Sequence, residues 1–163
     1  MSDTDLSLPS EELRIAARKA YYQTHLEEFF KRELKIGTKA IGGAQPFIPN
    51  PVQIPILRAA EKQLKQKGKI RQLIFKCRQP GISTYSSGII WNRVSMFQGV
   101  YAFIIAQDKG TVEHIFAMHD VFWKRMSPEI RRPQKYYNKG SEVVLGETMF
   151  EDDDLDSRLL VGQ

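Results

Sequence analysis

RQLIFKCRQPGISTYSSGIIWNRVSMF, residues 71–97, decides the expected fold, because it reads as a strand, a loop and a helix in succession. The apolar run at residues 73–75 is of strand type. A loop containing Pro80 and Gly81 follows, and a helical pattern begins near Ser83. A helix that starts after a tight basic loop offers unpaired N–H groups and a partial positive charge to an anion. The stretch therefore predicts a phosphate-binding turn.

The loop departs from the common phosphate-binding pattern in two positions, because the early glycine is also missing. That pattern ends in Gly-Lys-Ser/Thr, whereas residues 81–84 read GIST, with an apolar residue in the place of the lysine. Lys76 and Arg78 are the remaining candidates for contact with the β- and γ-phosphates. Ser83 or Thr84 offers a hydroxyl group to Mg²⁺. The same pattern also fits an ordinary strand-to-helix turn with a solvated lysine and arginine.

Residues 76–84, KCRQPGIST, resemble the deviant Walker A loop of the large terminase subunits of tailed bacteriophages, in which the lysine stands at the start of the loop. Three further segments fit the same family in the same order. They are NPVQ at 50–53, AFIIAQ at 102–107 and SRLLVG at 157–162. Together the four segments carry the resemblance over residues 47–163.

This resemblance implies an ATP-driven DNA-packaging motor with ATP and Mg²⁺ as cofactors. It implies that Lys76 and Arg78 act as catalytic cations on phosphate and that Ser83 binds the metal. It also implies double-stranded DNA as a partner and, in the full-length relative, the small terminase subunit, the portal and further copies of the chain. The implied nucleotide-binding residues are Asn50, Gln53, Gln79, Gly81, Ile82, Ser83 and Thr84.

Gln53 has a chemical reason to bind adenine as well as a simpler explanation. A side-chain amide can pair with adenine through one donor and one acceptor. Asn-Pro segments, however, usually form turns and caps, so Asn50 and Gln53 are also interpretable as capping or turn-forming residues. The sequence leaves both interpretations open.

Composition bounds the broad class of the protein. With 163 residues and a net charge of +5, the chain is long enough for one domain with a core and is compatible with an anionic partner. Its single cysteine excludes an internal disulfide, and residues 1–8 contain no apolar signal region. We therefore expect a reducing, cytoplasmic setting, which for a phage protein is the host cell. No apolar run approaches the ~20 residues that span a bilayer, so we expect no membrane partner.

The rest of the chain predicts an α/β, P-loop NTPase-like fold. We expect an incomplete, mostly parallel sheet with flanking helices, an N-terminal helix and a β-hairpin. Residues 1–46 would form the N-terminal helix and a connector, and residues 47–163 the N-terminal part of an ATPase domain. The expected elements are helices at 10–34, 54–67, 83–97 and 108–126, a central strand at 100–106 buried on both faces, a hairpin turning at 138–141 and a strand at 158–161.

Three charged or titratable patterns bear on possible DNA or metal sites. The basic residues between Lys62 and Arg71 indicate either a solvated helix end or a DNA contact. The acidic run at residues 151–154 is typical of a solvated loop, because the residues before it make a poor strand for a Walker B acid. His114 and His119 lie five positions apart, which does not suit a zinc pair on one helical face.

In the terminase family, the acid of the second ATPase motif and a nuclease domain follow a strand like the one at residues 158–161. Neither is found in this sequence, so we expect the N-terminal part of a terminase ATPase domain that is inactive alone. The alternatives are a non-catalytic remnant that binds nucleotide or DNA, and a fragment of a helicase-like ATPase.

Overall fold

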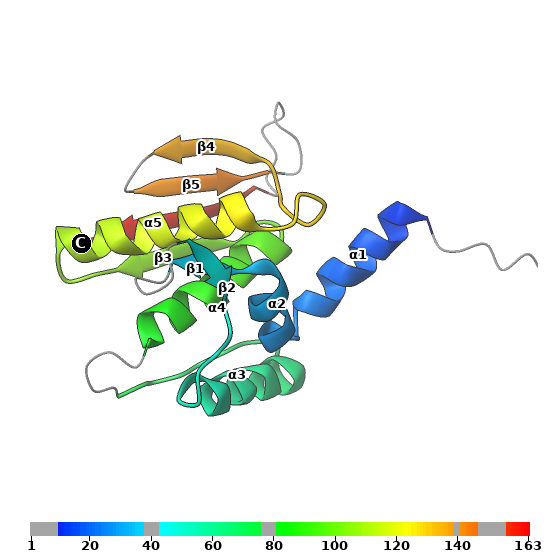
Figure 1. The fold of residues 1–163 in the computed structure, drawn as a ribbon, viewed down its shortest axis with the longest axis horizontal. Helices are drawn as coiled ribbons and strands as arrows, with labels where there is room; N and C mark the ends of the chain where they lie inside the picture. The colour runs from blue at the N-terminus through cyan, green and yellow to red at the C-terminus, as the bar shows by residue number, and fades with distance from the viewer. Residues whose placement is uncertain (1–9, 38–42, 76–80, 139–140, 147–155) are drawn as a thin grey trace, which may run out of the picture.

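The computed structural model describes residues 10–37, 43–75, 81–138, 141–146 and 156–163. Within them the helices and strands form a mixed α/β fold, which confirms the expected class (Figure 1). The helices are α1 (Glu11–Tyr22), α2 (Leu26–Glu33), α3 (Gln53–Lys67), α4 (Ile82–Met96) and α5 (Lys109–Arg125). The strands are β1 (Lys35–Gly37), β2 (Ala44–Pro46), β3 (Tyr101–Ile105), β4 (Gln134–Asn138), β5 (Glu142–Leu145) and β6 (Ser157–Gly162).

The prediction of one N-terminal helix from Ser10 to about Leu34 is wrong, because the chain turns between α1 and α2. Ser10 does cap α1, and its hydroxyl oxygen accepts the Leu13 N–H at 3.4 Å. After Tyr22 the bonds tighten to i→i−3, with the Thr24 N–H donating to the Tyr21 carbonyl at 3.3 Å. The turn brings α2 back against α1, so that their polar side chains meet.

Helix α3 confirms the prediction for residues 54–67 closely. Pro55 lies in its first turn, where the missing N–H costs no helical hydrogen bond. Gly68 ends the helix with a left-handed φ of 67°, and its N–H donates to the Leu64 carbonyl at 2.9 Å. The connector before α3 contributes β2, which pairs antiparallel with β1.

The main sheet has four strands in the order β3-β6-β5-β4. Only β3 and β6 run parallel, whereas the two pairs that involve β5 are antiparallel. The prediction of a mostly parallel sheet is therefore wrong. The physical reason is that the predicted hairpin, β4–β5, joins the sheet through β6 instead of standing apart from it.

Strand β3 lies at the edge of this sheet and not at its centre, which corrects a second expectation. Its residues alternate between a half-buried face and an open face. On the open face the exposed fractions are 69% for Tyr101, 62% for Phe103 and 73% for Ile105. The apolar run thus reflects one face packed against the core and one face that other described residues leave uncovered.

The strand predicted at residues 73–75 is also wrong. The segment is extended, but no strand pairs with it. Leu73 is 83% exposed and Phe75 is 90% exposed, while Ile74 packs against the core. A run of strand-forming residues becomes a strand only when a neighbour supplies ladder hydrogen bonds, and the described residues supply none here.

The core lies between the helices and the inner face of the sheet. Leu159 and Val161 of β6 are buried there beneath α4 and α5. Helix α4 also passes close to α2, because a side chain at Gly88 would meet the Phe30 ring at 2.7 Å. Trp91 of α4 and Phe122 of α5 are among the largest fully buried side chains. None of the described helices combines the length and the apolar character that a transmembrane segment requires.

Candidate functional site

Helix α4 begins at the position where the sequence predicts phosphate binding. Gly81 precedes it with a left-handed φ of 72°, and the first helical bond runs from the Tyr85 N–H to the Gly81 carbonyl at 3.1 Å. The helix has no side-chain cap and no acidic residue in its first turn. By contrast, Ser10 caps α1 and Asp108 caps α5. Within the described ranges no acceptor bonds to the N–H groups of residues 82–84, which favours an anion at this helix start.

Gln53 joins the start of α3 to the start of α4. Its Nε2 donates to the Gly81 carbonyl at 2.8 Å, and its Oε1 accepts the Asn50 N–H at 2.9 Å. The side chain is buried, with 3% of its surface exposed. A Cβ atom at Gly81 would lie 2.7 Å from Gln53 Nε2, so a larger residue there would strain the backbone and displace the Gln53 amide.

Asn50 has the capping role that the sequence left open as an alternative. Its Oδ1 accepts the N–H groups of Val52 and Gln53, each at 3.0 Å, at the start of α3. The structure therefore brings the predicted residues Asn50, Gln53 and Gly81 together. A contact of Gln53 with adenine stays a prediction. In this structure both the oxygen and the nitrogen of its amide group bond to other parts of the protein.

The other predicted site residues divide into two groups. Ile82 is buried, Ser83 is exposed and Thr84 is half-buried, all in the first turn of α4. Lys76, Arg78 and Gln79 lie outside the described residues, as does the acidic run at 151–154. In the described ranges no three His, Cys, Asp or Glu side chains gather into a metal-binding group. The metal ligand that the terminase resemblance implies, the Ser83 hydroxyl, lies within the described residues.

Tyr85 fixes the extended segment before the loop. Its hydroxyl donates to Gln72 Oε1 at 2.8 Å, and Gln72 Nε2 donates to the Ile56 carbonyl at 2.8 Å. Burial raises the pKa of Tyr85 to about 12, so the hydroxyl keeps its proton and remains a donor at neutral pH. This chain of bonds holds the segment before the predicted loop between α3 and α4.

A cavity of about 250 Å³ opens beside the first turn of α4, and sequence reasoning missed it. Strand β1 and helix α5 provide most of its walls. It is lined by Lys35, Ile36, Gly37, Thr84, His114, Ala117, Met118 and Val121. Thr84 belongs to the predicted site, but the other residues come from parts of the chain that share no local motif with it.

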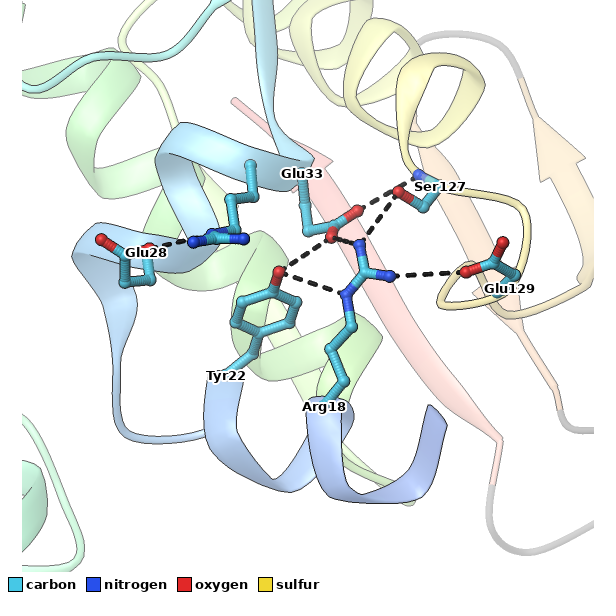
Figure 2. A network of polar contacts seen from close by, with 7 residues as sticks. Arg18, Tyr22, Glu28, Glu33, Ser127 and Glu129 are labelled. Atoms are coloured by element: carbon cyan, nitrogen blue, oxygen red, sulfur yellow. Dashed lines mark hydrogen bonds and ion pairs between the residues drawn. The ribbon is translucent and has the colours of Figure 1, made fainter. Parts of the chain in front are cut away.

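A buried polar network holds α1 against the body of the protein, as Figure 2 shows. The Glu33 carboxylate is completely buried and accepts hydrogen bonds from Arg18, from the Tyr22 hydroxyl at 3.0 Å and from the Ser127 N–H at 3.2 Å. Burial alone would raise the pKa of Glu33, but the bonds from Ser127 and Arg18 together hold it below its ordinary value. Because these partners satisfy the carboxylate, the network is a structural clamp.

The sequence was also compared with known proteins. Neither a scan against protein-family models nor a search of curated proteins finds a match to this chain.

Proposed function

We propose that the chain is the nucleotide-binding part of an ATP-driven DNA-packaging motor of the terminase type. The observation that carries the proposal is the hydrogen bond between Gln53 Nε2 and the Gly81 carbonyl, at 2.8 Å. It joins the NPVQ segment at 50–53 to the end of the KCRQPGIST loop, two of the segments on which the terminase resemblance depends. Their contact is expected if both segments serve one nucleotide site.

The start of α4 would bind the phosphates of ATP. Its free N–H groups and partial positive charge are worth ~0.3–1 kcal/mol toward one exposed anionic charge, which is too little to hold a triphosphate alone. Lys76 and Arg78 would supply the missing positive charge as the catalytic cations. Bound Mg²⁺ would neutralise phosphate charge, with the exposed Ser83 hydroxyl as one ligand.

Helix α3 and the segment after it would contact double-stranded DNA. Six exposed cations follow one another along this part of the chain, and none forms an ion pair within the part of the chain that the structure describes. Unpaired lysines and arginines favour contact with the phosphate backbone of DNA. The six residues are Arg58, Lys62, Lys65, Lys67, Lys69 and Arg71.

Nucleotide binding tests the proposal directly. Titration with a fluorescent ATP analogue should show Mg²⁺-dependent binding that Lys76→Ala and Arg78→Ala each weaken at least tenfold, as the loss of a charged phosphate contact requires. Ser83→Ala should reduce the Mg²⁺ dependence. Lys19→Ala, which removes a cation from α1, is the matched control and should leave the affinity within twofold. Absence of binding at millimolar analogue, or binding that neither loop variant changes, would contradict the proposal.

A further inference from the structure

The cavity between β1, α4 and α5 combines an apolar lining with uncommitted polar groups. Ile36, Ala117, Met118 and Val121 provide apolar surface, and β1 lies beside α5 in Figure 1. The side chains of Lys35, His114 and Thr84 make no hydrogen bond or ion pair with any described residue. An apolar lining next to an unpaired cation is complementary to a ligand that has both an apolar body and a negative charge.

The position and size of the cavity narrow the choice of ligand. Thr84 belongs both to the cavity lining and to the first turn of α4, so the cavity borders the proposed phosphate position. Its volume of about 250 Å³ lies below the ~300–1,000 Å³ of pockets that enclose a whole drug-sized ligand. The cavity therefore suits one ring system of a larger ligand whose remainder lies outside.

Gln53 leaves room for another base-binding element. Its side chain is buried, and its amide oxygen and one N–H already bond to Asn50 and Gly81, so the amide presents no open edge to adenine in this arrangement. A flat base has apolar faces that favour contact with aliphatic and thioether side chains, which the cavity supplies in Val121 and Met118. The polar edge of the base needs hydrogen-bonding groups, which His114 and Thr84 supply.

We propose that this cavity binds the base of the nucleotide whose phosphates lie at the start of α4, an inference that rests on the proposed function. Met118 and Val121 contact the ring faces, and Thr84 and His114 bond to its polar edge. Lys35 offsets part of the phosphate charge. Binding of the base and binding of the phosphates are thus two separable contributions to affinity.

Calorimetric titration with Mg-ATP and with Mg-tripolyphosphate separates these contributions, because the second ligand has phosphates and no base. The wild-type chain should bind ATP at least tenfold more tightly than tripolyphosphate. Ala117→Trp fills the cavity and should weaken ATP binding at least tenfold while leaving tripolyphosphate binding within twofold. Ala17→Trp places the same side chain on the exposed surface of α1 and should change neither affinity.

A wild-type measurement covers the case in which Ala117→Trp does not fold. In a chain labelled with ¹³C at the methionine methyl groups, the Met118 signal should shift with ATP and stay in place with tripolyphosphate. The buried Met126 should respond to neither ligand. An unmoved Met118 signal at saturating ATP, or equal weakening of both ligands by Ala117→Trp, overturns the base site and leaves the phosphate site standing. If the wild-type chain binds neither ligand, both proposals fail.

Discussion

The Glu33 side chain is completely buried, whereas the Arg18 side chain, whose guanidinium group pairs with it at 2.5 Å, is 39% exposed. The pair joins two helices that the sequence alone had suggested were one. Tyr22 and Ser127 complete the bonding of the carboxylate, so the network links α1, α2 and the turn after α5. Because a buried carboxylate without its cation is costly, stability should depend strongly on Arg18.

Arg18→Met should lower the free energy of unfolding by about 2–4 kcal/mol. Removing one partner of a fully buried pair costs ~3–5 kcal/mol, and the partial exposure of Arg18 reduces that figure. Arg32→Met is the matched control, since Arg32 forms an exposed i,i+4 pair with Glu28 at 2.9 Å and should matter little. Urea denaturation of both variants measures the difference. Equal losses would show that the buried carboxylate is not the cause.

Acidification should destabilise the protein through His119. Burial lowers the pKa of His119 from 6.5 to about 4, so between these values the unfolded chain binds a proton that the folded chain does not. Stability therefore falls as the pH drops from about 6.5 to about 4. Each tenfold difference in proton affinity is worth about 1.4 kcal/mol, so the full loss approaches roughly 3.5 kcal/mol.

His119→Phe should flatten this part of the pH–stability curve, because the aromatic contacts with Trp91 and Phe122 can be kept without a titratable ring. Urea denaturation between pH 4 and pH 7 measures the slope. His114→Gln, on the exposed side of the same helix, serves as the control and should keep the wild-type slope. A variant slope equal to that of the wild type would rule out His119 as its source.

Gly81→Ala should destabilise the protein more than Gly68→Ala. Both glycines have left-handed backbones, with φ of 72° and 67°, and this alone costs alanine about 1–2 kcal/mol. Gly68 faces open space, whereas a Cβ at Gly81 meets Gln53 Nε2 at 2.7 Å. The difference in unfolding free energy between the variants, expected to be at least about 1 kcal/mol, isolates this steric contact. Matching losses would mean that Gln53 moves aside without cost.

Phe103→Lys should reduce self-association of the isolated chain. Strand β3 pairs with β6 on one side only among the described residues, and Tyr101, Phe103 and Ile105 lie on its open face. Such edges favour pairing between molecules. A lysine there opposes pairing by charge repulsion and should leave stability within ~0.5 kcal/mol. Light scattering against concentration measures the effect. Leu13→Lys, at an exposed position on α1, should leave the scattering of the wild type unchanged.

Local signals in the sequence predicted much of the fold because their physical causes are local. Helix α3 ends at Gly68, α5 lies within the helix predicted at 108–126, and β4 pairs with β5 in the hairpin predicted to turn at 138–141. The order of the sheet was not predictable in this way. The antiparallel pairing of β5 with β6 depends on contacts between separate segments. The sequence of neither strand indicates which strand it pairs with.

The candidate site likewise has a part that follows from local sequence and a part that depends on tertiary packing. The glycine before α4 and the small polar residues after it follow from the motif, and the structure adds that Gln53 reaches Gly81. The cavity could not be predicted, because Lys35 and His114 approach it from elements 79 positions apart in the chain. No spacing rule connects residues that tertiary packing alone brings together.

The sheet order also constrains how the chain folds. Strand β6 lies between β3 and β5, although it follows both in the sequence. During synthesis, the hairpin β4–β5 can form by itself, but it cannot join β3 until residues 157–162 leave the ribosome. Pairing over such long sequence separations slows folding. The edges of β3 and β5 that pair with β6 therefore keep unpaired backbone N–H and C=O groups until a late step, when β6 completes the sheet.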